Sequence, residues 1–441
     1  MRFGTDGVRG HYGTELTLAY VTSLGRACAT VLGGGTWLLA RDPRASGPQL
    51  QAAFAAGLTS AGATATSLGV LPTPALAAES ARLGLPAAMI TASHNPHHDN
   101  GVKVFAAGGL KLADDVERLI EAALATDAGG VDPPAAVTGD DDGDDGGDAA
   151  ARYVGRVAGL FPGGILAGLR VVVDCANGSM SEVAPVAVSS LGAEVVVIHA
   201  APDGRNINDR CGATAPGSLA AAVVANAADL GLAFDGDGDR VIAVDHLGTV
   251  VDGDRMIALA ALQLREAGHL VEHTVVVTVM SNLGFLRAMQ AAGIRAVVTA
   301  VGDRYVLEAL DAGGFALGGE QSGHIIYRRL ATTGDGLLAG LRLAQHVAHT
   351  GRSLAELAGE VMTTYPQVLL NVRVADRHPQ AAAELADEIM AAEAVLVGEG
   401  RVLVRASGTE PLIRVMVEAA TAELAGATAA QLASAVQRRF G

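Results

Sequence analysis

One pattern occurs three times along the chain and limits what it can fold into. Each copy consists of a short apolar strand, a polar loop, an Ala-rich amphipathic segment, a glycine and a second apolar strand. The first strands are expected at residues 37–40, 171–173 and 275–279. Strands that alternate with helices form βαβ units and mostly parallel sheets. The sequence therefore predicts three related α/β domains with mixed sheets.

The last part of the chain follows a different order. A strand is expected at 367–374, a long helix from about residue 379, two strands at 402–405 and 413–418, and a closing helix. This order is typical of a smaller C-terminal α+β domain. For 441 residues we expect four domains around a central cleft, with limits at 1–150, 151–252, 253–365 and 366–441.

Composition excludes several classes of partner. Asp and Glu number 47 against 31 Lys and Arg, a formal net charge of −16, so we expect no bulk affinity for nucleic acid or an anionic membrane. No apolar run approaches the roughly 18 residues that span a bilayer, and the first residues lack the apolar core of a signal peptide. Cys28, Cys175 and Cys211 lie far apart without a CxxC pair, so neither a disulfide framework nor a zinc cluster is expected. We expect a cytoplasmic protein.

Residues 139–148 form an unusually acidic run with six aspartates in ten positions. A calcium-like spacing can be imagined, but Gly-rich acidic runs are usually solvated loops. This one also falls where an inter-domain connection is expected. We interpret it as a surface loop.

Three alternating aspartates, Asp235, Asp237 and Asp239, follow another predicted strand. Carboxylates spaced along a turn can converge on one hard cation, such as Mg²⁺ or Ca²⁺. An EF-hand is disfavoured, because Arg240 stands where that loop needs glycine, His246 stands where it needs glutamate, and a strand precedes it. The sequence predicts a metal loop, and the alternative is an acidic turn without metal.

A second polar loop, Thr-Ala-Ser-His-Asn-Pro, follows the apolar strand expected at 87–90. Ser93 is expected to be exposed at the carboxyl end of this strand, where α/β sheets place their ligands. His94 and Lys103 are candidate proton donors or charge partners. Lys103 is one of only two lysines in the chain, and a guanidinium cannot replace a compact amine with an adjustable pKa. Alone, Ser93 fits a turn-capping hydroxyl, but its neighbours favour a nucleophile.

Two further loops are polar. The segment 318–324 offers Glu320 and Ser322, an acceptor and a donor suited to sugar hydroxyls, although a plain Gly-rich turn is the alternative. Hydroxyls, backbone N–H groups and two arginines between the last two strands make a natural phosphate cradle. Its members are Arg405, Ser407, Gly408, Thr409 and Arg414. No GxxxxGK[ST] nucleotide loop and no HExxH motif occur.

Taken together, these segments resemble the α-D-phosphohexomutase superfamily over the full length of the chain. The resemblance is carried, in order, by residues 3–10, TASHNP, DGDGDR, GEQSGH and RASGTEP with IRVMVE. GEQSGH and SGTEP are similar to the glucosamine branch rather than to the phosphomannomutase and phosphoglucomutase branch. Three departures are an abbreviated start after Gly10, His97 where an aromatic residue is common, and the acidic run.

The resemblance implies a phosphosugar mutase that interconverts glucosamine 6-phosphate and glucosamine 1-phosphate for UDP-N-acetylglucosamine synthesis. It implies that Ser93 carries a phosphate and that a sugar 1,6-bisphosphate is both intermediate and activator. One Mg²⁺ per active site would bind a phosphoryl oxygen on Ser93 together with Asp235, Asp237 and Asp239. A homodimer is left open, since superfamily members often dimerise.

The resemblance also assigns roles to other residues. Lys103 is the expected general acid/base, with His324 and His94 secondary, while Arg9 offsets negative charge and Arg240 supports the phosphoserine. Glu320 and Ser322 would read the sugar hydroxyls. The residues expected to hold the phosphate that does not react are Arg405, Ser407, Gly408, Thr409 and Arg414.

Two alternatives stay open. A phosphoglucomutase or phosphomannomutase differs only in how it selects the 2-substituent and the 4-hydroxyl of the sugar. A catalytically silent phosphosugar-binding protein would need a damaged motif, and all five motifs are intact.

Overall fold

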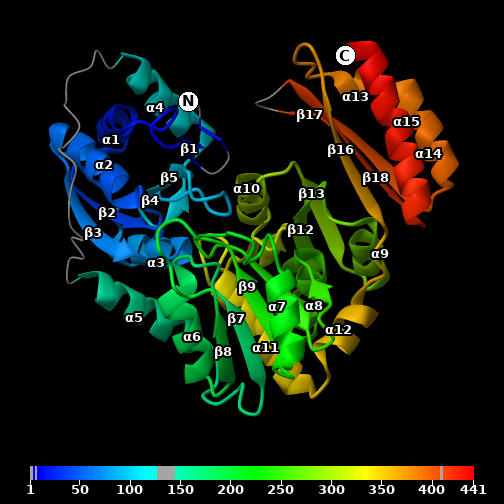
Figure 1. Cartoon of the computed structure of the whole chain (residues 1–441), viewed down its shortest axis with the longest axis horizontal. Helices are drawn as coiled ribbons and strands as arrows, with labels where there is room; N and C mark the ends of the chain where they lie inside the picture. Colours follow the sequence, from blue (N-terminus) through cyan, green and yellow to red (C-terminus); the bar gives the residue numbers. More distant parts are fainter. Residues whose placement is uncertain (1–2, 5–6, 127–144, 408–410) are drawn as a thin grey trace. The chain divides into compact units, whose positions relative to one another are not determined.

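The computed structural model describes residues 3–4, 7–126, 145–407 and 411–441, with the side chains of 145–147 excepted. Its internal contacts divide the chain into two compact units (Figure 1). Unit 1 holds Met1–Met280 and Ile294–Gly359, and unit 2 holds Ser281–Gly293 and Glu360–Gly441. Three sheets belong to unit 1 and one to unit 2.

The first sheet has the strand order β1-β5-β4-β2-β3, with β6 beside β5. Its strands are β1 (Val8–His11), β2 (Thr36–Arg41), β3 (Thr64–Val70), β4 (Ala87–Ile90), β5 (Asp99–Ala106) and β6 (Leu110–Lys111). Its helices are α1 (Leu18–Leu32), α2 (Gly47–Ser60), α3 (Thr73–Leu83), α4 (Asp114–Thr126) and α5 (Asp145–Ala158). Helices α1, α2 and α4 share one hydrophobic core with the strands, and Trp37 packs edge-on against Phe54 within it.

The second sheet has the order β11-β10-β9-β7-β8, and the third has the order β13-β12-β14-β15. The strands of the second are β7 (Arg170–Asp174), β8 (Glu194–Ile198), β9 (Leu230–Phe234), β10 (Val241–Asp245) and β11 (Val250–Val251). Those of the third are β12 (Thr274–Thr278), β13 (Arg295–Thr299), β14 (Leu317–Gly319) and β15 (Ile325–Tyr327). The helices of this region are α6 (Met180–Ser190), α7 (Gly217–Ala225), α8 (Gly253–Glu266), η1 (Val271–His273), α10 (Asp303–Gly313), α11 (Gly336–Thr350) and α12 (Leu354–Val361).

The three sheets of unit 1 repeat one topology. In each, the first strand of the repeat lies between the second and third and is parallel to both, and the fourth is antiparallel to the third. The repeats are β2-β3-β4-β5, β7-β8-β9-β10 and β12-β13-β14-β15. The prediction of three related α/β domains with mixed sheets is confirmed.

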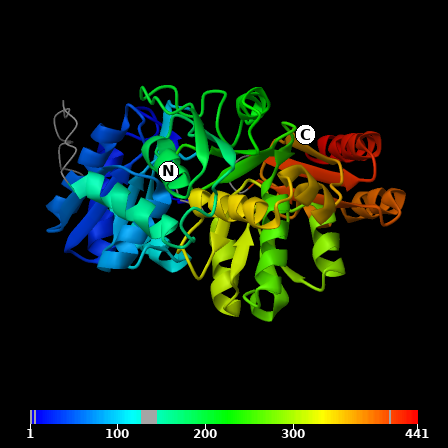
Figure 2. The same ribbon diagram turned by 90° about the horizontal axis from the view of Figure 1, so that it is seen from below.

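Unit 2 is built on a three-stranded antiparallel sheet. Its strands are β16 (Gln367–Arg373), β17 (Gly400–Ala406) and β18 (Leu412–Ala419), with β18 in the middle. Helices α14 (Ala386–Leu396) and α15 (Ala422–Phe440) share one core with this sheet (Figure 2), and α9 (Leu283–Ala291) also belongs to the unit. The prediction of one long helix from about residue 379 is wrong, because the structure has two helices there. A short helix, α13 (Ala381–Glu384), is separated from α14 by the non-helical backbone of Leu385, whose side chain is buried in the core.

The acidic run is also not one loop. Residues 139–144 lie outside the described residues, and Asp145 begins helix α5. For the last four residues of the run, the expectation of a loop is therefore wrong. Within α5, Asp148 lies 4.0 Å from Arg152, and ion pairs at this i,i+4 spacing support a helix.

All three cysteines are buried free thiols. Among the helices of the described residues, none combines the length and the apolar character that crossing a membrane requires.

Helices α1 and α2 pack closely through two glycines. A Cβ at Gly25 would overlap the carbonyl oxygen of Phe54, and a Cβ at Gly57 would overlap that of Thr22. Each glycine thus admits the backbone of the opposite helix, so the contact leaves no room for a methyl group.

We expect Gly57→Ala to lower the free energy of unfolding by about 1–3 kcal/mol, the usual result of overpacking. The matched control is Gly155→Ala in α5, where a Cβ would meet nothing within 4 Å. That change should be neutral or stabilise by about 0.5–1 kcal/mol, because alanine favours the helix. Urea unfolding of both variants provides the measurement, and equal effects would contradict the close α1–α2 packing.

Candidate active site

The three motif loops of unit 1 occupy one topological position. TASHNP connects β4 to β5, DGDGDR connects β9 to β10, and GEQSGH connects β14 to β15. Each loop therefore leaves the carboxyl end of the third strand of its repeat and returns on the antiparallel fourth strand. Ligands of α/β sheets bind outside the carboxyl ends of parallel strands. The repeated topology thus presents three different side-chain sets from equivalent positions.

Ser93 lies directly against the predicted metal loop. Its Oγ donates a hydrogen bond to Oδ2 of Asp235 at 2.5 Å and lies 3.4 Å from Nδ1 of His94. Ser93 has a relative exposure of 0%, so the expectation of an exposed serine is wrong. The metal loop covers it so closely that a Cβ at Gly236 would lie 2.6 Å from the Ser93 carbonyl oxygen. The backbone of Ser93 is left-handed (φ 53°), a conformation that persists only where surrounding contacts fix it.

Those contacts come mainly from Arg44, which no sequence motif singled out. Its buried guanidinium donates to four main-chain carbonyl oxygens, those of Ser93, Asn95, Pro96 and Asp99. Asp42 compensates the charge, accepting from Nε of Arg44 at 2.9 Å and from the Thr91 hydroxyl at 2.6 Å. Asn208 donates to the same Ser93 carbonyl at 2.9 Å. The only signal in the sequence was the Arg-Asp-Pro-Arg stretch that begins at the last residue of β2.

The three aspartates are buried and converge. One carboxylate oxygen from each of Asp235, Asp237 and Asp239 lies within 4.8 Å of the others. Nζ of Lys103 lies 2.7 Å from Oδ2 of Asp237 and 2.7 Å from Oδ2 of Asp239, and the Thr73 hydroxyl donates to Asp237 at 2.6 Å. The Oδ1 atoms of Asp237 and Asp239 are buried without a hydrogen bond. Unsatisfied carboxylate oxygens in such a cluster fit a hard divalent cation.

The pKa values of Asp235 and Asp239 are shifted in opposite directions. Burial, together with the charges of Asp239 and Asp237, raises the pKa of Asp235 to about 8. Burial would also raise the pKa of Asp239, but the adjacent Lys103 ammonium holds it well below its usual range. A divalent cation favours the ionised carboxylate. Metal binding is therefore coupled to loss of the proton from Asp235.

His324 links the metal loop to helix α10. Its Nδ1 lies 3.6 Å from Oδ1 of Asp239, and its Nε2 lies 3.7 Å from Oδ2 of Asp303. The Gly334 N–H donates to Nε2 at 3.2 Å, which makes Nε2 an acceptor and assigns the ring proton to Nδ1. Asp303 in turn forms an ion pair with Lys111, the second lysine of the chain.

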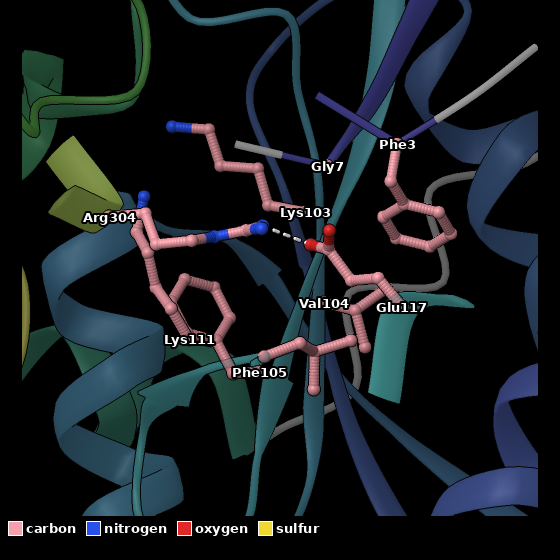
Figure 3. A pocket seen from close by; sticks show the side chains of 9 residues that line it. Phe3, Gly7, Lys103, Val104, Phe105, Lys111, Glu117 and Arg304 are labelled. Atoms are coloured by element: carbon pink, nitrogen blue, oxygen red, sulfur yellow. Dashed lines mark hydrogen bonds and ion pairs between the residues drawn. The ribbon is translucent and has the colours of Figure 1, made fainter. Parts of the chain in front are cut away.

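A small pocket lies beside the stem of Lys103 (Figure 3). Arg304 of α10 forms ion pairs across it with Glu117 and Asp114 of α4. The Lys103 side chain extends away from the Arg304–Glu117 pair (Figure 3), and its amine reaches the aspartates. Together with Lys111–Asp303, these pairs join α4 and β6 to the start of α10.

Basic groups surround His94. Burial, with the charges of Arg240 and Arg9, lowers the pKa of His94 to about 4, so its ring is neutral near neutral pH. Nε of Arg240 lies 3.8 Å from Oδ1 of Asp239, and its backbone N–H donates to Oδ1 of Asp235 at 3.2 Å. Two guanidinium groups near a buried serine hydroxyl favour binding of a phosphate there.

The GEQSGH loop closes on itself. The Glu320 N–H donates to the His324 carbonyl at 3.0 Å, and Oε1 of Glu320 accepts from the Gly302 N–H at 3.1 Å. The Ser322 hydroxyl is exposed and lies 3.4 Å from Oε2 of Glu320. Glu320 itself is half-buried. An accessible hydroxyl beside a carboxylate can bind a polar ligand.

In unit 2, Arg405 of β17 and Arg414 of β18 face each other directly across the antiparallel pair. Burial and the Arg414 charge lower the pKa of Arg405. Like charges at opposed positions destabilise a sheet, and a bound anion would relieve this. Ser407 is buried, and its N–H donates to the Leu412 carbonyl at 2.9 Å. Gly408 and Thr409 lie outside the described residues.

Comparisons with known proteins assign the family. The models described as Phosphoglucomutase/phosphomannomutase match the chain in four parts: alpha/beta/alpha domain I at 1–129, domain II at 164–248, domain III at 252–365 and the C-terminal domain at 369–435. Phosphoglucosamine mutase of Rhodococcus jostii (strain RHA1) is 53% identical over 445 residues, covering 98% of each chain. The protein of the same name from Streptomyces griseus is 52% identical, covering 100% of this chain and 99% of that one.

Solved structures agree on the fold. A putative phosphomannomutase from Thermus thermophilus has a TM-score of 0.80 at 25% identity, covering 99% of both chains. N-acetylphosphoglucosamine mutase of Aspergillus fumigatus, in complex with GlcNAc-6P and magnesium, has a TM-score of 0.71 at 19% identity, covering 100% of this chain and 96% of that one. A variant of that enzyme in complex with glucose 1,6-bisphosphate has a TM-score of 0.66 at 19% identity, covering 100% and 95%. The superfamily resemblance inferred from the motifs is confirmed, and the chain belongs to the phosphoglucosamine mutase family of phosphohexomutases, which are phosphosugar-isomerising enzymes.

Proposed function

We propose that this enzyme interconverts glucosamine 6-phosphate and glucosamine 1-phosphate, in the cytoplasm, through a phosphate carried on Ser93 and a sugar 1,6-bisphosphate intermediate. The observation that carries the proposal is the contact of the Ser93 hydroxyl, at 2.5 Å, with one of three converging buried aspartates. The sequence identity of 52–53% to the phosphoglucosamine mutases of Rhodococcus jostii and Streptomyces griseus supports the choice of the amino sugar.

The residues present fit one magnesium ion. Asp235, Asp237 and Asp239 would hold it together with an oxygen of the phosphate on Ser93. The ion would neutralise charge on the transferring phosphoryl group when bound. Lys103 now compensates Asp237 and Asp239, so its amine would give up part of these contacts to the ion and become available to the substrate.

The transfer itself needs two proton movements. A sugar hydroxyl oxygen forms a bond to the phosphorus of phosphoserine, the bond from phosphorus to the Ser93 oxygen breaks, and the hydroxyl proton leaves. We assign Lys103 as the general acid/base for the sugar hydroxyl. The neutral ring of His94, 3.4 Å from the Ser93 hydroxyl, is placed to move a proton at that oxygen. Nδ1 of His324 faces Oδ1 of Asp239 at 3.6 Å, and we assign His324 a secondary role in proton transfer. The second transfer, from the other phosphate back to Ser93, reverses these steps.

The remaining assignments follow the sequence prediction. Arg9 and Arg240 would stabilise the phosphate on Ser93, and Glu320 and Ser322 would bind the sugar hydroxyls. The proposed domain limits remain 1–150, 151–252, 253–365 and 366–441. The residues proposed to hold the phosphate that does not react are Arg405, Ser407, Gly408, Thr409 and Arg414. The opposed Arg405 and Arg414 support this last assignment.

A phosphomannomutase or phosphoglucomutase activity is the second candidate, favoured by the likeness to the Thermus thermophilus protein. We expect kcat/KM to be at least about tenfold higher for glucosamine 1-phosphate than for glucose 1-phosphate or mannose 1-phosphate, in assays primed with glucose 1,6-bisphosphate. A higher value for either neutral sugar would reverse the assignment.

Ser93→Ala should lose the phosphate in intact-mass spectra and nearly all turnover, whereas Ser60→Ala should keep both. Unchanged turnover in Ser93→Ala would instead identify a different mechanism.

Arg44 supplies a test of positioning. Arg44→Lys keeps the charge but cannot reach four carbonyl oxygens, so we expect kcat to fall at least about tenfold with KM changed little, because the Ser93 loop loses its fixed position. Arg26→Lys is the control: Arg26 is half-buried in α1 and donates to the Ser60 hydroxyl, so this change should leave kcat unchanged. Circular-dichroism melting verifies that the variant is folded. A rise in KM at constant kcat would contradict the positioning role.

His94 should remain neutral in the dephosphorylated protein well below pH 6.5. Its folded pKa of about 4 lies below the unfolded value, so the unfolded chain takes up the proton first and stability decreases as the pH falls from 6.5 toward 4. The imidazole resonance, identified by its absence from His94→Gln, should keep its neutral chemical shift down to pH 5. A titration midpoint of the His94 resonance near pH 6.5 would show that the ring is neither buried nor close to Arg240 and Arg9.

A further inference from the structure

A second cluster of metal-ligating side chains lies in the second sheet, apart from the aspartate loop. Asp174 ends β7, His199 follows β8, and Cys211 lies in the loop between β8 and α7. One ligand atom from each lies within 4.8 Å of the others. The topology brings them together, because β7 and β8 are parallel neighbours whose carboxyl ends meet at one edge.

The distances suit a small tetrahedral ion. Nδ1 of His199 lies 3.2 Å from Oδ1 of Asp174. With metal–ligand bonds of about 2.0–2.3 Å, neighbouring ligand atoms of a tetrahedral site stand about 3.3–3.8 Å apart. Nδ1 of His199 is buried and makes no hydrogen bond, although the ring as a whole is half-exposed. This nitrogen faces the Asp174 carboxylate, and the Cys211 thiol lies beside both.

The surroundings hold the ligands in place. Asp174 is fully buried, and its two oxygens accept from the N–H groups of Ala176 and Gly212, each at 2.9 Å. The second bond fixes the backbone next to Cys211, so one ligand positions another. The Asn177 amide nitrogen lies 4.0 Å from the Cys211 sulfur, within reach of a weak hydrogen bond. Such outer hydrogen bonds are what orients the ligands of protein metal sites.

The donor set selects the metal. Magnesium takes oxygen ligands in octahedral geometry, whereas a thiol, an imidazole and one carboxylate suit zinc and leave a fourth position for water. A Cys–His–Asp nucleophile is the other use of these residue types. Cys211 is fully buried, with a relative exposure of 0%, and has no access for a substrate. The half-exposed His199 offers an entry path for an ion.

We propose that Asp174, His199 and Cys211 form a zinc site, separate from the magnesium loop. On binding, the sulfur–zinc bond forms as the Cys211 thiol releases its proton to water. The site lies one strand from the magnesium loop, because Asp174 pairs with Ala233 of β9, two residues before Asp235. The Ala213 N–H also donates to the Phe234 carbonyl at 2.8 Å. The zinc site would therefore adjoin the strand that leads into the magnesium loop without contributing a ligand to that loop.

The test uses the full chain, stripped of metal and kept reduced, with Mg²⁺ in excess so that the aspartate loop is filled. One equivalent of Co²⁺ should produce a thiolate-to-cobalt charge-transfer band and the visible absorption of a tetrahedral ion, and Zn²⁺ should abolish both. Cys211→Ser should remove the charge-transfer band and weaken Zn²⁺ binding about 100-fold or more by calorimetry. Cys175→Ser and Cys28→Ser are the matched controls and should keep the band.

Because Cys211 is buried and its substitution could disturb folding, a second variant at a half-exposed ligand provides an independent test. His199→Gln changes a half-exposed side chain and should weaken Zn²⁺ binding at least about tenfold while mutase activity with Mg²⁺ stays within about twofold. The proposal is overturned if the parent shows no thiolate band, or if Cys211→Ser binds Zn²⁺ as tightly as the parent. Binding that Mg²⁺ displaces would assign the ion to the aspartate loop and also overturn it. Each result is independent of which sugar phosphate the enzyme isomerises.

Discussion

Three buried carboxylates determine which side chains must surround the candidate site in unit 1. One oxygen of each lies within 4.8 Å of an oxygen of the other two. Left alone they repel, and burial alone would keep them protonated. Lys103 compensates two of them at 2.7 Å, and the proton on Asp235 compensates the third. The Ser93 hydroxyl donates to that same Asp235. The Ser93 hydroxyl, the Lys103 amine and the aspartate loop are therefore one electrostatic unit, in which binding of a cation or a phosphate would change the state of every member.

The repeated topology explains how three domains supply one such unit. In each repeat the motif loop connects the parallel third strand to the antiparallel fourth strand. The same backbone arrangement therefore occurs three times and carries different side chains each time. The loop after the first strand then becomes a support. In the first repeat it supplies Asp42 and Arg44, which hold the Ser93 loop by its carbonyl oxygens. In the second repeat the support comes from Asp174, the last residue of the first strand, which accepts from the backbone beside Cys211.

The repeats, the strands and the polar loops could be predicted from the sequence, because hydrophobic periodicity and local motifs depend only on residues that are close in sequence. What could not be predicted depends on long-range packing. The burial of Ser93 follows from the approach of Gly236, which is far away in sequence, and the break at Leu385 follows from a core that forms only in the folded unit. Arg44 and Asn208 were missed because their role is to bind backbone oxygens, and such partners have no motif. His199 and Cys211 carry no spacing signal, since a strand order, and not a sequence interval, brings them to Asp174.

The two lysines show how the chain uses charge. Among 31 basic side chains only Lys103 and Lys111 are lysines; Lys103 is buried and Lys111 half-buried, and each forms ion pairs with aspartates. A planar guanidinium is suited to forked contacts such as those of Arg44, and it stays charged at any accessible pH. An amine is compact enough to stand between Asp237 and Asp239, and it can lose its proton when the balance of charge changes. Net charge therefore says little about this enzyme. The acidic total of −16 coexists with basic groups placed directly against carboxylates, as Lys103 is against Asp237 and Asp239.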